Sequence, residues 1–516
     1  MNRHILNRRH DAVVVGSGPN GLAAAIRLAQ AGLQVTVYEA HDTIGGGVRS
    51  AALTRPGFVH DVCSAVHPMA AASPYFRTLP LERFGLDWVQ PTVPLAHPLN
   101  DRSVLLHRSV EQTAAELGRD GERYLELTGP LLRAMGPLLE SVLAPLTQVP
   151  RHPLLMARFG LTALLPAALL ARRFVTPEAQ ALIAGLAGHS VLPLTTPGTS
   201  AIALILGLAA HQVGWPFPRG GAQALTDALA GYFRSLGGEI VTGAPISRLA
   251  QLPAAHTVIL DVGPGQLLTL GGGPLPARYE AALRRYRYGP GVFKIDYALS
   301  GPVPWSDPRV AQAGTVHLGG SLAEIRLAEA QVARGEHPER PYVLLAQHSA
   351  FDPTRAPAGQ HTLWAYCHVP PGSRTDMTTQ IEAQIERSAP GFRDLVIGRA
   401  TRHAAAYQDY NPNYVGGDVN GGQATLWQLL ARPVLSVSPY RTPWPGVYLC
   451  SAATPPGGGV HGMCGLHAAE AALSDLGLRQ PRQGGRGTSY DLPSSAVLPR
   501  PPADLPPVSS VSAQRH

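Results

Sequence analysis

The sequence predicts an α/β fold from two features: a glycine-rich turn between two short apolar runs near the N-terminus, and alternating apolar and polar runs from Phe293 onward. The first run, residues 12–15, is apolar and β-branched, as a strand buried on both faces should be. The Ala-rich stretch 22–31 predicts a helix that Gly32 ends. The second run, 35–38, completes a strand–helix–strand unit.

The turn in this unit has the spacing G-x-G-x-x-G, formed by Gly16, Gly18 and Gly21. These glycines permit a tight turn, a close approach of a pyrophosphate to the backbone, and close packing of helix on strand. Glu39 ends the second strand, where a carboxylate accepts hydrogen bonds from an adenosine ribose and repels a 2′-phosphate. We therefore predict a dinucleotide site that disfavours NADP. A structural turn without a ligand is the alternative, since glycine is abundant (55 residues).

The composition indicates a globular chain of more than one domain. It has 516 residues, 45% of them hydrophobic and 15% charged, which is too long for one ordinary core and too apolar for disorder. The net charge is +7, but no Lys/Arg block with interleaved aromatic residues occurs, so we expect no nucleic-acid partner. Contact with an anionic membrane surface stays open.

The four cysteines form no C-x-x-C pair, zinc spacing or disulfide framework. We therefore expect no metal site, no redox dithiol of the glutathione-reductase kind, and a reducing, cytoplasmic location. The first ten residues, MNRHILNRRH, lack the apolar region of a secretory signal. No uncharged apolar run reaches the roughly 18 residues of a membrane span, so we predict no transmembrane helix.

Several segments after the first unit carry candidate functional groups. Gly45–Gly47 and Arg49 suggest a second backbone approach to the pyrophosphate with a counter-charge; a flexible loop with a solvated arginine is the alternative. His60, Asp61 and His67 lie in a segment rich in small residues, and are candidate proton-handling groups or ordinary turn and packing residues.

The middle of the chain is strongly apolar. Residues 111–127 predict an amphipathic helix, whereas 154–170 and 201–210 are apolar with arginines at 151, 158, 172 and 173. They form either the buried helical core of a substrate or lid domain, or a surface that dips into lipid with arginines at the headgroups. Both alternatives predict an apolar substrate environment.

The remaining segments carry the patterns of α/β units and of an antiparallel sheet. The helix 222–236 and the strands 239–242 and 257–261 should return the chain to the nucleotide domain. Alternating runs at 293–301, 315–320, 342–349 and 362–370 predict an antiparallel sheet, with a helix at 377–385. The strand, glycine-rich turn and helix of 446–476 give a second phosphate- or ring-binding geometry. From residue 481 the composition predicts a disordered tail.

Together these segments resemble the FAD-dependent phytoene desaturase superfamily. The closest likeness is to the phytoene-dehydrogenase-related branch, whose members carry a pyridine nucleotide-disulphide oxidoreductase domain. The resemblance covers about residues 10–478 and rests on the first unit with Glu39 and on five further segments: GFVHD (57–61), CSAVHP (63–68), WPFPRGG (215–221), NYVGGD (413–418) and PPGGGVHGMCG (455–465).

The resemblance implies a Rossmann-type FAD-binding domain assembled from three segments, 1–100, 214–288 and 421–480, and an α+β substrate domain. The substrate domain would consist of a helical or lid segment, 101–213, and an antiparallel sheet, 289–420, with the tail at 481–516. The implied FAD contacts are Gly16, Ser17, Gly18, Pro19, Asn20, Gly21, Glu39, Ala40, Gly46, Gly47, Val48, Arg49, Ile246, Ala453, Thr454, Gly458, Gly459 and Val460.

The sequence departs from the family pattern at two places. The family's Gly-Gly-Arg would place arginine where this chain has Gly47, and Ser451-Ala452-Ala453 replaces a glycine–acid pair near the ribityl chain. A phytoene-type substrate is therefore not implied.

The resulting functional prediction is an FAD-dependent oxidoreductase that desaturates an apolar, carotenoid- or isoprenoid-like substrate by hydride transfer to flavin N5. The candidate catalytic residues are Asp61, which the superfamily pattern G-F-x-x-D matches, and His461. The alternatives are an amine oxidase-like enzyme and a non-catalytic lipid-binding protein like the GDP-dissociation inhibitors. The partner hypotheses are an apolar small molecule, a peripheral membrane contact and a homodimer.

Overall fold

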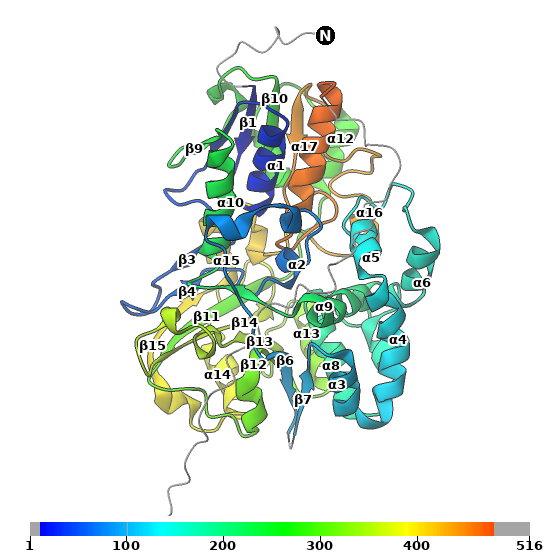
Figure 1. The fold of residues 1–516 in the computed structure, drawn as a ribbon, viewed down its shortest axis with the longest axis vertical. Helices are drawn as coiled ribbons and strands as arrows, with labels where there is room; N and C mark the ends of the chain where they lie inside the picture. Colours follow the sequence, from blue (N-terminus) through cyan, green and yellow to red (C-terminus); the bar gives the residue numbers. More distant parts are fainter. Residues whose placement is uncertain (1–10, 101, 479–516) are drawn as a thin grey trace, which may run out of the picture. The chain divides into compact units, whose positions relative to one another are not determined.

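A five-stranded parallel sheet contains the N-terminal strand–helix–strand unit, as predicted (Figure 1). In the central strand Val13 lies opposite Thr36 on one side and Val258 on the other. The computed structural model describes residues 11–100 and 102–478; the predicted N-terminal arm and C-terminal tail lie outside them. The strands of this sheet, in spatial order, are β16 (Val447–Leu449), β10 (Thr257–Leu260), β1 (Ala12–Val15), β2 (Val35–Tyr38) and β9 (Glu239–Val241).

Helices cover both faces of the parallel sheet. Ala12 and Val14 of β1 face a core shared with three helices, whereas Val13 and Val15 face a smaller core on the other side. The first face is covered by α1 (Pro19–Gln30), α10 (Gln223–Ser235) and α17 (Met463–Asp475), and the second by α11 (Pro264–Thr269) and α12 (Ala277–Arg284).

A seven-stranded sheet contains the predicted antiparallel strands. It is mixed, because β6 runs parallel to β12 while the other neighbours are antiparallel. Strand β6 lies in the predicted first FAD-binding segment, 1–100, and β7 lies in the predicted helical or lid segment, 101–213. In spatial order the strands are β15 (Val396–Arg402), β11 (Gly291–Leu299), β14 (His361–Val369), β13 (Val343–Ala346), β12 (Ala313–Leu318), β6 (Val93–Pro98) and β7 (Ser103–Leu106).

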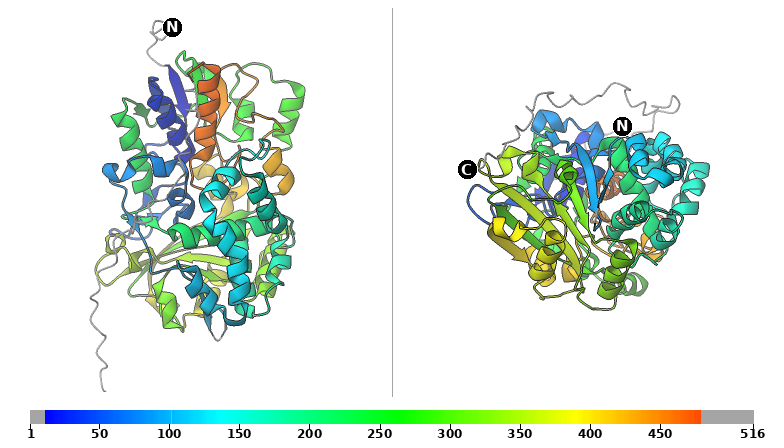
Figure 2. Two further views of the ribbon diagram at one scale, coloured as in Figure 1. Left: turned by 45° about the vertical axis from the view of Figure 1, so that its right-hand side comes forward. Right: turned by 90° about the horizontal axis from the view of Figure 1, so that it is seen from below.

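Most helices of the middle of the chain gather along one side of the seven-stranded sheet (Figure 2). The predicted helix 111–127 is two helices, α3 and α4, because the chain turns at Gly118, whose φ of +52° interrupts the helical path. The helices of this segment are α3 (Val110–Glu116), α4 (Gly121–Arg133), α5 (Met135–Val142), α6 (Pro153–Ala163), α7 (Ala167–Ala171), α8 (Pro177–Gly188) and α9 (Thr199–Val213).

The remaining short elements connect the two sheets. One two-stranded ribbon pairs neighbouring segments and another pairs segments that are distant in sequence, and further helices pack around the sheets. They are β3 (Ser50–Ala51) with β4 (His60–Asp61), β5 (Trp88–Val89) with β8 (Phe217–Pro218), α2 (Pro68–Ala71), α13 (Leu322–Ala333), α14 (Thr378–Glu386), α15 (Ala404–Tyr410) and α16 (Leu426–Leu430). The described residues belong to one compact unit, and the finer division into domain segments stays a prediction.

Candidate functional site

A cavity of about 420 Å³ runs from the glycine-rich turn of the parallel sheet to one face of the seven-stranded sheet. Most of the predicted FAD contacts line it, whereas Gly21, Thr454 and Gly458 lie just behind its wall. The predicted contacts that line the cavity are Gly16, Ser17, Gly18, Pro19, Asn20, Glu39, Ala40, Gly46, Gly47, Val48, Arg49, Ile246, Ala453, Gly459 and Val460.

The glycine-rich turn leaves room for a ligand only because its residues lack side chains. Gly16 has φ +98°, and a Cβ at Gly21 would overlap the carbonyl oxygen of Gly16. A Cβ at Gly46 would lie 3.1 Å from the Cα of Gly18, so the two glycine loops are in contact. Gly18 is the N-cap of α1 and supplies no side-chain cap, and a helix N-terminus favours an anion. This backbone fits a pyrophosphate.

Glu39 lies buried at the end of β2, beside this turn. Its Oε2 accepts hydrogen bonds from the Ser17 amide (3.0 Å) and hydroxyl (2.5 Å), and its Oε1 accepts one from Arg49 Nη2 (3.0 Å). The Arg49 guanidinium also lies over the ring of Tyr410, 5.5 Å from its centroid. Arg49 therefore pairs with the ribose-binding candidate, and its predicted role as a counter-charge for the pyrophosphate stays a prediction.

Asp261 follows β10 and lines the same end of the cavity, although the sequence analysis did not select it. Its Oδ2 accepts a hydrogen bond from the Gly21 amide at 3.1 Å. Burial, with a smaller contribution from the charge of Glu39, raises the pKa of Asp261 to about 7. The signal that could have found it is an acid at the carboxyl end of a parallel strand beside a glycine-rich turn.

We expect Asp261→Asn to reduce the loss of stability of the apoprotein as the pH rises. The folded pKa of about 7 exceeds the usual 3.8, so the carboxyl stabilises the fold below pH 3.8 and this contribution disappears as pH rises through 7. Asparagine keeps an acceptor for the Gly21 amide but does not ionise. Between pH 5 and 8 the melting temperature of the variant should fall by several degrees less than that of the native protein. Parallel curves of melting temperature against pH would contradict the raised pKa of Asp261.

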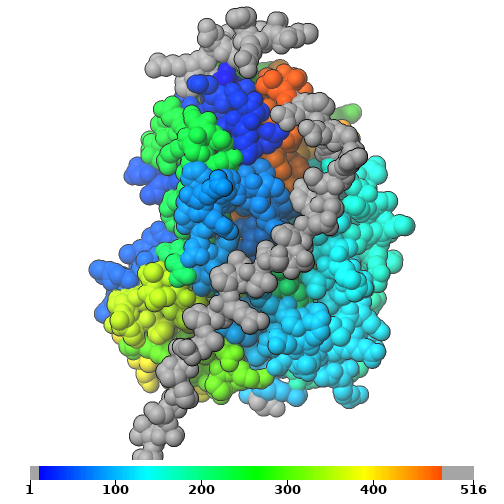
Figure 3. Space-filling view, viewed as in Figure 1, coloured from blue at the N-terminus to red at the C-terminus, as the bar shows by residue number. Residues whose placement is uncertain are grey.

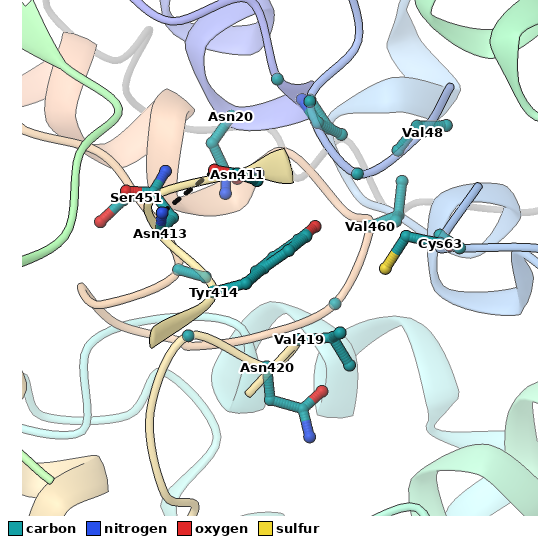
Figure 4. Close-up of a pocket in the computed structure, with 18 of the residues that line it drawn as sticks. Asn20, Val48, Cys63, Asn411, Asn413, Tyr414, Val419, Asn420, Ser451 and Val460 are labelled. Carbon is teal, nitrogen blue, oxygen red and sulfur yellow. Dashed lines mark hydrogen bonds between the residues drawn. The ribbon is translucent and has the colours of Figure 1, made fainter. Parts of the chain in front are cut away.

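A loop from the predicted NYVGGD segment closes the middle of the cavity. Asn413 Oδ1 accepts from the Gly263 amide (2.7 Å) and its Nδ2 donates to the Asp261 carbonyl (3.0 Å). Figure 4 shows Tyr414 lying across the pocket. A Cβ at Gly47 would overlap the Tyr414 hydroxyl. The glycine that replaces the family's arginine thus makes room for a tyrosine.

The other end of the cavity rests on the seven-stranded sheet. Trp364 and Tyr366 of β14 line it, and the neighbouring strand β11 places Asp296 opposite Trp364 and Lys294 opposite Tyr366. Lys294 Nζ pairs with Asp296 and lies 6.0 Å from the centroid of the Trp364 ring. Burial lowers the pKa of Lys294 and raises that of Asp296 to about 6. The alternating pattern of FKIDYAL predicted a strand but did not indicate this buried ion pair.

The geometry speaks against a catalytic role for Asp61. It does not line the cavity, and its carboxylate is occupied by Ser50 Oγ (2.7 Å), the Ala222 amide (2.7 Å) and Arg355 Nη1 (3.1 Å to each oxygen). Burial raises the pKa of Asp61, but the Arg355 guanidinium, His348 and the hydrogen bonds from Ala222 and Ser50 together outweigh it, and the pKa falls to about 2. Asp61 is thus one partner of a buried ion pair, and its predicted catalytic role stays a prediction.

His461 is likewise set back from the cavity. Its Nδ1 accepts a hydrogen bond from the amide of Met463, the first residue of α17, at 3.1 Å. Burial lowers the pKa of His461 to about 4. This side chain caps a helix, which argues against the predicted catalytic role. In the described part of the chain no cluster of three or more His, Cys, Asp or Glu side chains could hold a metal ion.

Comparisons with known proteins agree with this geometry. Residues 14–79 match the family model described as NAD(P)-binding Rossmann-like domain. Pyridine nucleotide-disulfide oxidoreductase domain-containing protein 2 of Rattus norvegicus is 26% identical over 91% of this chain and 94% of its own length. Hydroxyneurosporene desaturase of Cereibacter sphaeroides is 27% identical over 90% of this chain and 98% of its own. The chain is thus similar to a desaturase over most of its length.

Solved structures show the same fold for this chain. An oxidoreductase from Methanosarcina mazei superimposes with a TM-score of 0.62 at 17% identity, covering 90% of this chain and 99% of its own. Putrescine oxidase superimposes with a TM-score of 0.59 at 17% identity, covering 91% and 99%. The predicted resemblance and α/β fold are confirmed, and the relatives support an FAD-dependent oxidoreductase.

Proposed function

We propose that this protein uses FAD to dehydrogenate an apolar, carotenoid- or isoprenoid-like substrate. The observation that supports this function is the continuity of one cavity between a backbone pyrophosphate cradle and an apolar, aromatic chamber. At the chamber Leu206, Trp215, Leu344, Trp364 and Tyr366 form the lining. Such a lining binds carbon chains through buried area, and its few polar atoms orient them.

The residues of this chain would hold the cofactor and exclude water. The glycine loops and the start of α1 would bind the pyrophosphate, and Glu39 the ribose, with Ile246 near the adenine. When bound, FAD supplies a hydride acceptor at flavin N5. Tyr414 and Cys63 close the cavity between the cradle and the chamber, which keeps the reacting region dry. An amine substrate is less well matched, because the carboxylates among the described lining residues, Glu39 and Asp261, lie at the cradle.

The test is an absorbance spectrum of the purified protein, followed by release of the chromophore and its identification by mass. We expect flavin bands, release of FAD, and anaerobic bleaching of the bound flavin by an apolar polyene or isoprenoid. Reduction by dithionite is the control for a competent flavin. A colourless protein that takes up no added FAD would refute the proposal and favour the lipid-binding alternative.

We also propose that α6 and α16 contact an anionic membrane surface. Val149, Leu154 and Leu161 are 91%, 86% and 78% exposed, and Trp427 and Val437 are 68% and 80% exposed. Gly198 lies between the ends of α6 and α16, so the two groups of exposed side chains are neighbours. The Gly198 amide donates to the Leu164 carbonyl, just after α6, at 3.0 Å, and a Cβ at Gly198 would lie 2.7 Å from the side chain of Leu426 in α16.

Charge and position support the same contact. Arg151, Arg158, Arg172 and Arg173 are exposed around α6 and α7, where they can reach lipid phosphates. The helical segment forms a broad flank in the space-filling view of Figure 3. Helix α9, which lies against α6, supplies Leu206 to the cavity, so an apolar substrate could pass from lipid to the chamber along this side. No helix among the described residues is long and apolar enough to cross a membrane.

Replacing two of these leucines should weaken binding to vesicles. We expect Leu154→Ser/Leu161→Ser to reduce co-sedimentation with phosphatidylserine-containing vesicles by about tenfold or more, since each leucine loses its apolar contact with lipid. Leu327→Ser, at a leucine 56% exposed on α13, is the matched control and should bind normally. The surface is a subunit interface instead if the native protein does not bind vesicles and the double substitution dissociates a dimer.

A further inference from the structure

Two rows of side chains on the seven-stranded sheet form the floor of the chamber. Thr315, Ala346 and Trp364 are direct neighbours across β12, β13 and β14, and all three line the cavity. The next row consists of His317, Leu344 and Tyr366. Because Thr315 and His317 are two residues apart on one strand, both rows lie on the same face.

The first row carries polar atoms that have no partner. Thr315 Oγ1 and Trp364 Nε1 make no hydrogen bond within the described part of the chain. Their residues are only 3% and 8% exposed. A buried hydroxyl or indole N–H without a partner is costly, so such atoms in a binding chamber indicate a polar group on the ligand.

His189 adds a polar ring beside the second row. It follows the last residue of α8 and lines the cavity. Its Nε2 lies 2.9 Å from His317 Nε2, and the edge of its ring meets Trp215, with the centroids 5.6 Å apart. The ring is therefore held in one orientation, while its Nδ1 has no hydrogen-bond partner in the ranges that the structure describes.

A third imidazole lies next to His317. His97 Nε2 lies 2.8 Å from the Gly320 carbonyl, which only accepts, so this nitrogen carries the proton and Nδ1 is an acceptor. His317 Nδ1 lies on the other side of Gly185, where a Cβ would be 2.8 Å from the Nδ1 of either ring. Neither Nδ1 makes a hydrogen bond within the described part of the chain.

One Nε2 of the His189–His317 pair donates to the other, so His189 Nδ1 is a polar atom at the cavity in either tautomer. All three rings are neutral at neutral pH, because burial lowers the pKa of His97 to about 4, of His189 to about 3 and of His317 well below its usual value. The imidazoles thus hold a neutral polar nitrogen at the wall of an otherwise apolar chamber.

We propose that this chamber binds a hydroxyl group on an otherwise apolar, isoprenoid-like substrate, with a hydrogen bond between the hydroxyl and His189 Nδ1. A hydroxyl both donates and accepts, so it can pair with this nitrogen in either tautomer. Thr315 Oγ1 and Trp364 Nε1 are further unpartnered polar atoms in the same chamber. The inference extends the proposed function, from which it takes the apolar substrate class. A hydroxyl fits better than an ammonium group, since the carboxylates among the described lining residues lie at the pyrophosphate cradle.

The test compares geranylgeraniol with the hydrocarbon that lacks its hydroxyl and with the corresponding primary amine. Binding is followed by tryptophan fluorescence, because Trp215 and Trp364 line the chamber. We expect the alcohol to bind about tenfold or more tightly than the hydrocarbon, which would leave His189 and Trp364 unpaired. The alcohol should also bind more tightly than the amine.

Two substitutions and one control attribute this preference to the site. His189→Leu should abolish the preference for the alcohol while retaining the hydrocarbon. Trp364→Phe removes one N–H with little change of shape and should weaken the preference for the alcohol. This variant provides the test if His189→Leu does not fold. His337→Leu, at an exposed histidine, should leave the preference intact.

Three outcomes would overturn the inference: equal binding of alcohol and hydrocarbon, tighter binding of the amine, or an unchanged preference in folded His189→Leu. Failure of every probe to bind would also overturn it. Since the readout needs no flavin, a protein that lacks FAD but shows the His189-dependent preference would refute the proposed oxidoreductase and leave this binding site standing.

Discussion

The Gly21→Ala protein is expected to fold but to bind FAD about tenfold to a hundredfold more weakly than the native chain. The new Cβ would overlap the Gly16 carbonyl oxygen, so the turn between β1 and α1 must open. Overpacking of this kind typically costs about 1–3 kcal/mol, which corresponds to that loss of affinity if the displaced turn no longer fits a pyrophosphate. Equilibrium titration of the apoprotein with FAD, followed by flavin fluorescence, measures the change.

A second glycine of the same domain provides the control. Gly265 lies in α11, and a Cβ there would meet no atom within 4 Å. Gly265→Ala should therefore bind FAD like the native protein and melt at the same temperature or slightly higher. Native affinity in the Gly21→Ala protein would show that the cofactor does not depend on this turn.

Arg355→Met should be the most destabilising single substitution that we predict. Arg355 is fully buried and bridges two buried carboxylates: its Nη1 lies 3.1 Å from both Asp61 oxygens, and its Nε lies 3.2 Å from Asp352 Oδ2. Its Nη2 also donates to the Pro218 carbonyl at 3.2 Å. Removing one partner of a buried ion pair leaves an uncompensated charge and typically costs about 3–5 kcal/mol. Chemical denaturation or the melting temperature reports the loss.

The double variant Arg355→Met/Asp61→Asn separates this explanation from a simple packing defect. Neutralising Asp61 removes one stranded charge, so the double variant should be more stable than Arg355→Met alone. Arg334→Met, which removes an exposed partner of Glu336, is the control and should melt like the native protein. A double variant that is less stable than Arg355→Met would show that charge is not the cause.

The parts of the fold that follow from short-range patterns were predictable. The strand–turn–helix–strand unit from Ala12 to Tyr38 is encoded by consecutive residues, and so are the alternating strands β11 and β14. The pairing of β6 with β12 was not, because a short strand containing Pro94 and Pro98 carries little pattern and its partner is distant in sequence.

The candidate site divides in the same way. Glu39 and the glycines were found from spacing, whereas Asp61 was given a catalytic role because its partner Arg355 lies 294 residues further along the chain. His189 and His317 are 128 residues apart, and neither lies in a motif. Only tertiary packing shows that one aspartate is neutralised and that one imidazole nitrogen is left bare.

The order of the strands in the parallel sheet has a consequence for biosynthesis. Strand β10 is flanked by β1, Ala12–Val15, which is translated long before it, and by β16, Val447–Leu449, which is translated long after it. While a ribosome is still producing the middle of the protein, β10 has an open edge and α1 lacks the apolar cover that α17 provides. Nascent chains should therefore depend on holding chaperones until translation passes this point. A premature stop before Val447 should give an insoluble product instead of a smaller working protein.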